Sequence, residues 1–312
     1  MNDGAFFLGV DGGGTKTAFV CIDCAGAVVA SAVTGTTYHL EVGADEVVSR
    51  LDQGIADICG QLGIGRDALG FVFFGLPAYG EDSAVDPQLD AACARLLGHD
   101  RYLCGNDMVC GWAGSLGGKD GINIVAGTGS IGYGERLGNS ARIGGWGEVF
   151  GDEGSAYWIA IQGLALFSRM SDGRAPRGVL YDHIVEALSL STDLDLCRRI
   201  MGQDAMSRGE IAGLANLVSR AAADGDGGAH ALLLSAAREL AALATGLRTV
   251  LGFAPGERVP VSWSGGVLLN QPLVRDSFAG ILADSGLFEP SEPLYSPGYG
   301  AALYARKRAQ RG

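Results

Sequence analysis

Short apolar runs separated by turn residues occupy the first 35 residues of the chain. Residues 6–10, 18–23 and 27–33 are apolar runs of strand length, and small or polar residues separate them. Runs this short that end in glycine are more typical of buried strands than of helices. The pattern predicts a β-hairpin followed by a third strand.

Helical spacing replaces this pattern in the next segment. Residues 45–62 carry apolar side chains at helical spacing and end before Gly63, and residues 70–76 return to a strand-like run. A short helix at 89–97 and a strand at 102–105 follow. This alternation predicts an α/β domain in which helices pack against a mixed sheet.

The opening order of elements begins again near residue 121. A strand-like run at 122–126 leads into the turn GTGS at 127–130, and another strand-like run covers 131–137. A repeated strand, turn and strand indicates two similarly built domains. The letters GTGSIG match GxGxxG, but no helix opens after them, as the dinucleotide-binding fingerprint requires.

Helical patterns dominate after residue 152. The expected helices cover 153–170, 211–223, 230–251, 271–285 and 298–308, and one expected strand covers 259–264. The predicted fold class is therefore α/β with two domains. Their predicted extents are residues 1–118 plus 297–312 for the first, with its closing helix, and 119–296 for the second, with helical insertions.

The sequence VDGGGTKT at residues 10–17 carries the clearest chemical signal. Glycine tolerates positive φ and lacks a Cβ, so backbone N–H groups can approach a ligand and form a site for phosphate. A P-loop would need Lys at position 15, where Thr stands. The candidate contacts of this hairpin are Gly13, Gly14, Thr15 and Lys16 for phosphate and Asp11 beside a metal ion; the alternative is a plain hairpin turn.

The GTGS turn predicts a second phosphate contact, formed by Gly127, Thr128 and Gly129. Phosphoryl transfer also needs a carboxylate that accepts the proton of the attacking hydroxyl. Asp107, in GND after the expected strand at 102–105, is the candidate base, because ligands bind at the carboxyl ends of strands in α/β sheets. An N-cap role for Asp107 is an equally good interpretation.

A second glycine-dense stretch, GGWGEVFGDEGS, covers residues 144–155. One interpretation makes Trp146 a core residue and Asp152 a helix N-cap. The other makes Trp146 an apolar platform for a sugar ring and Asp152 an acceptor for sugar hydroxyls, with backbone groups at Gly145 and Gly147 completing the contacts. The density of glycine favours the sugar interpretation, because a plain cap would not require it.

Composition narrows the classes of partner. The 312 residues carry a formal net charge of −12, and the one basic run is Arg306–Arg311, which suits the end of a last helix. Nucleic acid is therefore not an expected partner. Seven scattered cysteines and the absence of a leader-like segment predict a cytoplasmic location, and no apolar run is long enough to span a membrane.

Five motifs occur together in one order: DGGGTKT, GND, AGTGS, GGWGEVFGDEGSAYWIA and SGGV. In order and approximate spacing they resemble the N-acetylglucosamine kinases of the BadF/BadG/BcrA/BcrD ATPase family, within the acetate and sugar kinase/Hsp70/actin superfamily. The resemblance covers essentially the whole chain. It implies two ribonuclease H-like (actin-like ATPase) domains with a nucleotide and sugar cleft between them.

The resemblance also implies roles for individual residues in an ATP-dependent, Mg²⁺-dependent transfer to O6 of an amino sugar. Asp107 would be general base and sugar ligand, and Asp11 would hold Mg²⁺. The implied ATP contacts are Gly13, Gly14, Thr15, Lys16, Gly127, Thr128, Gly129, Gly265, Gly266 and Ala222, and the implied sugar contacts are Gly145, Trp146, Gly147 and Asp152.

Two departures from the family pattern fall on the sugar side. Tyr38 stands where vertebrate-type enzymes have an Asn that contacts the sugar, and residues 75–78 read GLPA in place of a serine–glycine turn. The expected substrate is N-acetylglucosamine, with glucosamine as an alternative. A BadF-type ATPase that activates a 2-hydroxyacyl-CoA dehydratase and a non-catalytic sugar or nucleotide sensor also stay open, as does a homodimer.

Overall fold

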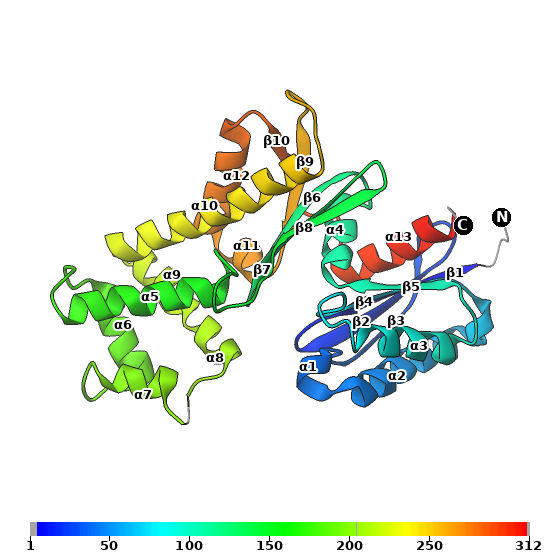
Figure 1. The fold of residues 1–312 in the computed structure, drawn as a ribbon, viewed down its shortest axis with the longest axis horizontal. Helices are drawn as coiled ribbons and strands as arrows, with labels where there is room; N and C mark the ends of the chain where they lie inside the picture. Colours follow the sequence, from blue (N-terminus) through cyan, green and yellow to red (C-terminus); the bar gives the residue numbers. More distant parts are fainter. Residues whose placement is uncertain (1–4, 204, 311–312) are drawn as a thin grey trace. The chain divides into compact units, whose positions relative to one another are not determined.

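The computed structural model describes residues 5–203 and 205–310 (Figure 1). Its described residues divide into two compact units. Unit 1 comprises the residues up to Asp120 together with those from Glu292 onward, and unit 2 comprises Gly121–Ser291. Arg311, the last residue of the basic run, lies outside the described residues.

Unit 1 is built on a five-stranded mixed sheet with the order β3-β2-β1-β4-β5. Strands β1 to β3 are antiparallel neighbours, whereas β1, β4 and β5 run parallel. The strands are β1 Phe6–Gly12, β2 Lys16–Ile22, β3 Val28–Gly35, β4 Leu69–Leu76 and β5 Tyr102–Asn106. The central strands are buried along most of their length, as expected for a sheet covered on both faces.

Helices from distant parts of the sequence cover this sheet. The C-terminal helix α13 (Pro297–Ala309) packs against β1, β4, β2 and α4, while α2 packs against β3, β2 and α3. The other helical elements of unit 1 are α1 His39–Val42, α2 Ala44–Leu62, the 3-10 turn Arg66–Ala68, α3 Asp86–Leu97 and α4 Met108–Leu116. The last helix therefore completes the first unit.

Unit 2 repeats the sheet topology of unit 1. Its strand order is β10-β9-β6-β7-β8, with β6, β7 and β8 antiparallel and β6, β9 and β10 parallel. The strands are β6 Gly121–Ala126, β7 Ser130–Arg136, β8 Asn139–Gly144, β9 Val259–Ser264 and β10 Phe288–Pro290. The α/β class and the two similarly built halves predicted from the repeated turn are thus confirmed.

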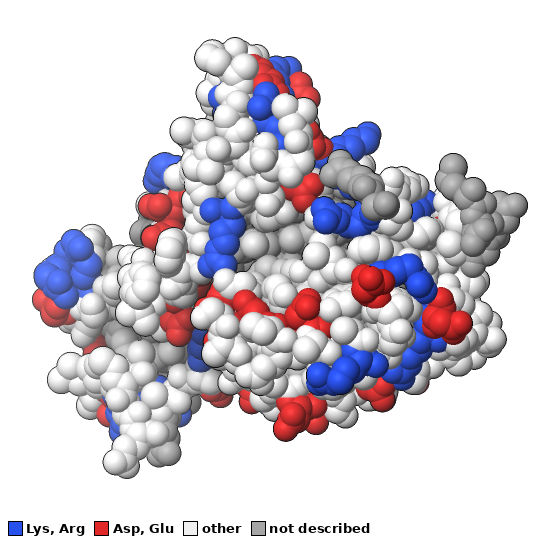
Figure 2. All heavy atoms as spheres, turned by 45° about the vertical axis from the view of Figure 1, so that its right-hand side comes forward, with Lys and Arg blue, Asp and Glu red and all other residues white. Residues whose placement is uncertain are grey.

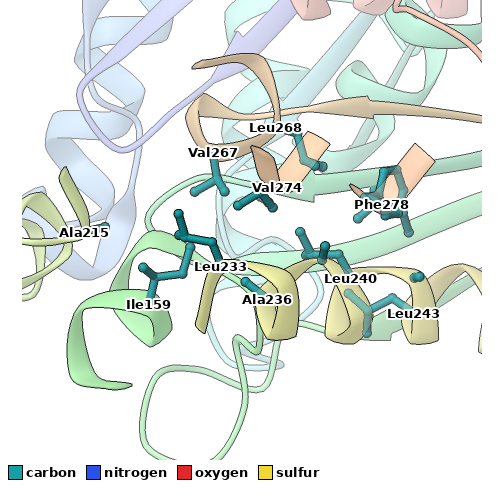
Figure 3. Close-up of a cluster of buried hydrophobic side chains, with 14 of the residues drawn as sticks. Ile159, Ala215, Leu233, Ala236, Leu240, Leu243, Val267, Leu268, Val274 and Phe278 are labelled. Atoms are coloured by element: carbon teal, nitrogen blue, oxygen red, sulfur yellow. The ribbon is translucent and has the colours of Figure 1, made fainter. Parts of the chain in front are cut away.

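Most of the helical insertion lies between β8 and β9. It comprises α5 Ala156–Ser171, α6 Val179–Leu188, α7 Asp195–Met201, α8 Arg208–Gly213, α9 Ala215–Ala223 and α10 Gly227–Val250, and α11 Gly266–Asn270 and α12 Pro272–Asp284 follow β9. The long helix α10 crosses β6, β7 and β8, and α12 packs on α10. Figure 3 shows the core between them, where Leu240 and Phe278 are fully buried.

Two expectations about helices need correction. The single helix expected at 211–223 is two helices, α8 and α9, that meet at Leu214, and the capping box of Ser207 and Glu210 starts α8 before the apolar pattern begins. The helix expected at 153–170 starts at Ala156, because the side chain of Ser155 accepts the N–H of Trp158 as its N-cap.

Candidate functional site

The parallel strands of unit 1 bring three distant segments to one sheet edge. In the register of the sheet, Asp11 of β1 pairs with Gly75 of β4, and Leu76 pairs with Asn106 of β5. A Cβ on Gly75 would lie 3.4 Å from the Cα of Asp107 and 3.1 Å from the carbonyl oxygen of Val10. Asp11 and Asp107 therefore flank the end of β4, where α/β sheets bind their ligands.

Residues 13–15, the first of the two turns predicted to contact phosphate, join β1 to β2 at this edge. We call them the first phosphate turn. The N–H of Gly13 donates to the carbonyl oxygen of Lys16 (3.0 Å), and Gly14, Thr15 and Lys16 are exposed. None of residues 12–14 has positive φ. Gly12 contributes the missing Cβ, since a Cβ there would overlap the hydroxyl of Thr37, whereas a Cβ on Gly14 would meet no atom within 4 Å.

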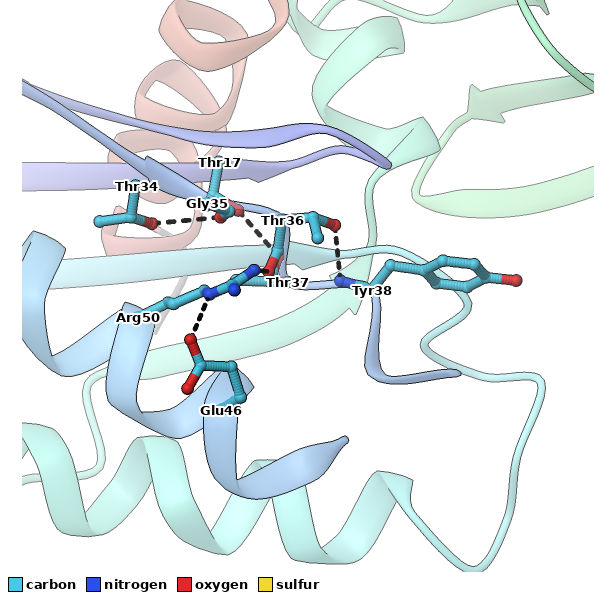
Figure 4. Close-up of polar contacts among 8 residues, drawn as sticks. All are labelled: Thr17, Thr34, Gly35, Thr36, Thr37, Tyr38, Glu46 and Arg50. Carbon is cyan, nitrogen blue, oxygen red and sulfur yellow. Dashed lines mark hydrogen bonds and ion pairs between the residues drawn. The ribbon is translucent and has the colours of Figure 1, made fainter. Parts of the chain in front are cut away.

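Threonine side chains connect this turn to the segment that carries Tyr38; Figure 4 draws the contacts of Thr36 with Tyr38 and of Thr17 with Thr37. The Thr36 hydroxyl donates to the carbonyl oxygen of Gly13 (2.7 Å) and accepts the N–H of Tyr38 (3.0 Å). The Thr17 hydroxyl donates to the hydroxyl of Thr37 (3.0 Å). The ring of Tyr38 points away from this cluster. Two hydrogen bonds through the Thr36 hydroxyl therefore connect Tyr38, the departure from the family pattern, to the first phosphate turn.

Asp107 occupies the N-cap position of α4, but its side chain makes no capping hydrogen bond. The Asn106 side chain instead accepts the N–H of Met108 (3.1 Å). Burial, and to a smaller extent the charge of Glu81, raises the pKa of Asp107 to about 7, against the lowering effect of nearby backbone N–H groups. A carboxylate near neutrality at a sheet edge suits a proton acceptor better than a cap.

Asp11 lies in the same electrostatic environment. Burial raises its pKa to about 7, and the charge of Asp107 adds to that rise, whereas a hydrogen bond from the Cys110 thiol and the charge of Lys16 lower it. A buried carboxylate that lies near a second negative charge favours a bound cation. No group of three or more His, Cys, Asp or Glu side chains arranged to hold a metal occurs among the described residues.

The second phosphate turn joins β6 to β7 in unit 2. The Gly127 N–H donates to the carbonyl oxygen of Gly129 (2.9 Å), and the carbonyl oxygens of Gly127 and Thr128 accept N–H groups from the first turn of α5 (2.9 and 3.2 Å). The start of α5 therefore fixes the shape of the turn. A Cβ on Gly127 would meet no atom within 4 Å, so the turn is open to a ligand.

Gly265 and Gly266 form another glycine turn, which lies beside the second phosphate turn because β6 and β9 are parallel neighbours. Gly265, which follows β9, has φ of 90°, and a Cβ there would lie 2.5 Å from the backbone of Ala126. Only glycine fits this contact and this conformation. Gly266 begins α11, and Ala222 lies partly buried in the last turn of α9 against the core of unit 2. Gly127 and Gly265 are thus brought to one edge.

The segment between β8 and α5 carries the predicted sugar contacts. Trp146 is 72% exposed, and Gly145 and Gly147 have φ of 68° and 88°. The alternative that Trp146 is core is therefore wrong, as is the alternative that Asp152 caps a helix, since Ser155 caps α5. Asp152 is only 3% exposed and has φ of 58°, a strained conformation for a residue other than glycine.

An arginine that sequence reasoning missed holds Asp152. Arg208, the first residue of α8, donates from Nη2 to Oδ2 of Asp152 (2.7 Å) and pairs through Nε with Glu148 (3.0 Å). A Cβ on Gly129 would lie 2.8 Å from the same Nη2. No local pattern relates residue 208 to residue 152, so only the packing of α8 against α5 could reveal the pair.

These features define a class: an α/β protein of the actin-like ATPase fold, with two units of one topology and a glycine-rich hairpin turn in each. The comparisons with known proteins agree. The model of the BadF/BadG/BcrA/BcrD ATPase family matches residues 8–305. The chain belongs to the BadF/BadG/BcrA/BcrD ATPase family, as the motif resemblance predicted.

Two relatives with assigned activities match nearly the full chain. An N-acetylmuramic acid/N-acetylglucosamine kinase of Clostridium acetobutylicum is 30% identical over 307 residues, covering 96% of this chain and 98% of the relative. An N-acetyl-D-glucosamine kinase of Dictyostelium discoideum is 30% identical over 310 residues, covering 96% and 97%. A solved structure from Chromobacterium violaceum is 25% identical with a TM-score of 0.73, covering 96% of this chain and 99% of that one.

Figure 2 shows Lys and Arg side chains in separate groups, with Asp and Glu between them, on the face that it draws. Within residues 5–203 and 205–310, no helix is both long and apolar enough to cross a membrane.

Proposed function

We propose that this protein transfers the γ-phosphoryl group of ATP to an amino sugar, with N-acetylglucosamine as the acceptor and N-acetylglucosamine 6-phosphate as the product. The observation that carries the proposal is the edge of the unit 1 sheet. There an open phosphate turn, Asp11 and the uncapped carboxylate of Asp107 lie together. The names of the two relatives support the choice of acceptor.

The ATP contacts proposed lie at the hairpin turn of each unit. The N–H groups of Gly13 and Gly127 already donate within their own turns, so these two residues would shape the turn rather than supply donors. In unit 1 the contacts proposed are Gly13, Gly14 and Thr15, with the ammonium of Lys16 beside the phosphates. In unit 2 they are Gly127, Thr128 and Gly129, with Gly265, Gly266 and Ala222 toward the adenosine. Exposed N–H and hydroxyl groups on a turn of this kind attract phosphate oxygens without a large net positive charge on the protein.

Asp107 would take the proton of the sugar 6-hydroxyl as that oxygen attacks the γ-phosphorus. The bond from phosphorus to the β,γ-bridging oxygen breaks, ADP leaves, and the proton remains on the Asp107 carboxylate until solvent removes it. A base with a pKa of about 7 is matched to this task, because it is largely ionised at pH 8 and still accepts a proton readily.

The residues around Asp11 fit a magnesium ion bound mainly through water and phosphate. Mg²⁺ uses one or two protein carboxylates and keeps several waters, which agrees with the lack of a larger ligand cluster among the described residues. When bound, the ion would neutralise charge on the phosphates. Asp11, near the end of β1 beside the first phosphate turn, would hold it, and Asp107 would be free for the sugar.

The sugar contacts proposed in unit 2 are Gly145, Trp146, Gly147 and Asp152. An indole ring that is 72% exposed offers an apolar face to a pyranose ring, and the Asp152 carboxylate offers acceptor oxygens to its hydroxyls. In unit 1, Tyr38 is the sugar contact that the motif resemblance implies. Because Tyr38 replaces the amide of the family pattern, glucosamine remains the alternative acceptor. The alternative of an ATPase that activates a 2-hydroxyacyl-CoA dehydratase would need cysteines that hold an iron–sulfur cluster. Cys104 and Cys110, which flank Asp107 in the sequence, are both buried, so neither favours that alternative.

The test is a coupled ADP-release assay with Mg·ATP and a panel of acceptors. The panel comprises N-acetylglucosamine, glucosamine, N-acetylmannosamine, glucose and N-acetylmuramic acid, the last because one relative is named for it. We expect the highest kcat/KM on N-acetylglucosamine. ADP release that no sugar accelerates, with ATP still bound, would contradict the proposed function.

A further inference from the structure

The buried Asp152 carboxylate depends on neighbouring residues to hold it in place. A carboxylate that is only 3% exposed in a left-handed backbone conformation is costly to keep, so other residues must hold it. Its Oδ2 atom accepts the Nη2 hydrogen bond of Arg208, and no other side-chain hydrogen bond to Asp152 occurs among residues 5–203 and 205–310. Oδ1 therefore keeps its capacity to accept hydrogen bonds.

Arg208 joins three parts of unit 2. Its guanidinium bonds to Asp152, pairs with Glu148 in the exposed part of the glycine-dense segment, and lies against Gly129 of the second phosphate turn. The planar fork of an Arg side chain can serve two carboxylates in a fixed geometry, which the single ammonium of Lys cannot. The side chain stays 40% exposed, so it is placed at the surface of the unit beside these groups.

The backbone at Arg208 is also held in place. Ser207 and Glu210 form a complete capping box at the start of α8, and α8 packs against α5. The position of Arg208 is therefore set by two helices rather than by a loop. With two carboxylates around one guanidinium, the cluster of Glu148, Asp152 and Arg208 carries a formal charge of −1, which disfavours direct binding of a phosphate by Arg208.

We propose that Arg208 is a positioning residue for the sugar: it holds Oδ2 of Asp152 so that Oδ1 is presented to a sugar hydroxyl, and it links this carboxylate to the second phosphate turn. The inference rests on the proposed function for its substrate, but the arrangement of the segment 144–155 can be measured without any substrate. Arg208 acts through Asp152 and does not itself touch the reacting atoms.

The experiment compares Arg208→Ala and Arg208→Lys with Arg198→Ala, a change to an exposed arginine on α7. Steady-state kinetics give KM for the sugar and for ATP. We expect Arg208→Ala to lower kcat/KM for the sugar by about 10- to 100-fold, while KM for ATP changes less than about threefold. Arg208→Lys should recover only part of the loss, and added guanidinium should partly restore Arg208→Ala. Arg198→Ala should match the wild type.

Hydrogen–deuterium exchange of the ligand-free proteins separates this inference from the proposed function. We expect faster exchange of residues 144–155 in Arg208→Ala and not in Arg198→Ala. Unchanged exchange, or a rise in KM for ATP that equals or exceeds that for the sugar, would overturn the positioning role. Faster exchange in a protein whose wild type phosphorylates no sugar would instead overturn the proposed function alone. Arg208→Lys keeps the test valid if Arg208→Ala fails to fold.

Discussion

Replacing Asp107 with Asn should abolish most of the activity and at the same time stabilise the protein. The carboxylate has a pKa of about 7 in the fold against an ordinary value of 3.8. Between these values the folded protein binds more protons than the unfolded chain, so the free energy of unfolding falls as pH rises from about 4 to about 7. Asn has the same shape and carries no charge, so it escapes this penalty.

The expected gain in stability follows from the raised pKa of Asp107. A rise of about three in pKa corresponds to roughly 4 kcal/mol at 1.36 kcal/mol for each unit. Because Asp107 taken as a whole residue is half-buried, we discount this figure for solvent screening to about 1 kcal/mol, which is about 2–4 °C in Tm for a unit of this size. The loss of a general base should lower kcat by about 10²- to 10⁴-fold.

The assay is thermal unfolding from pH 4 to pH 8.5 in EDTA without nucleotide, with Asp100→Asn as the control. Asp100 is an exposed carboxylate near the start of β5. We expect the Tm difference between Asp107→Asn and the wild type to be near zero at pH 4 and to grow until about pH 7, while Asp100→Asn shows no such trend. A variant that is destabilised equally at every pH would show that Asp107 is a structural cap and refute the reasoning.

Three further outcomes follow from the site. The value of kcat/KM for the sugar at saturating Mg·ATP should rise with pH through about 7, because ionised Asp107 is the active form; a flat profile from pH 5.5 to 9 would count against it. Trp146→Ala should raise KM for the sugar about tenfold with little change in Tm or in KM for ATP, since the ring is exposed, and an equal rise in both KM values would exclude the platform role. Gly265→Ala should lower the free energy of unfolding by about 2–4 kcal/mol, measured by urea unfolding, because φ is 90° and Ala126 is in the way; an unchanged midpoint would contradict the close contact.

The sequence was sufficient for the elements that carry strong local patterns. Strand β9 was predicted with its exact bounds, and α2 to within one residue at its start, because an apolar stripe and Gly63 mark its face and its end. The repeat of a strand, a glycine turn and a strand predicted the second unit, because the same local chemistry recurs at residue 121. Each of these predictions needs only residues that lie close together in the sequence.

What the sequence could not supply depends on contacts between distant residues. Strand β8 (Asn139–Gly144) lies at a sheet edge with no fully buried residue, so no apolar run marks it. Helix α8 has six residues, and α9 starts at Ala215. Apolar side chains continue at helical spacing across the boundary between them, so the sequence pattern predicts one helix. Arg208 reaches Asp152 across 56 positions, and the Thr36 hydroxyl reaches Gly13 across 23. Such pairs arise only when the chain is packed.

The need for glycine at the turns after β1 and β9 also depends on contacts between residues distant in the sequence. The first turn uses glycine at position 12 to admit Thr37, and the second uses Gly265 to admit the backbone of Ala126. The two motifs predicted that glycine matters at both turns, and the physical reason at the first turn is close approach at Gly12. In the sugar segment, Gly145 and Gly147 have positive φ, which the sequence analysis did not predict.

The most direct test of the central claim is to identify the product by phosphorus NMR. The protein is incubated with Mg·ATP and N-acetylglucosamine, and the new phosphorus signal is examined for coupling to sugar protons. We expect a monoester signal coupled to the two protons on C6, formed in step with ADP and lost in Asp107→Asn. A signal coupled to the proton on C1, or inorganic phosphate as the sole product, would contradict the assignment of an amino-sugar 6-kinase.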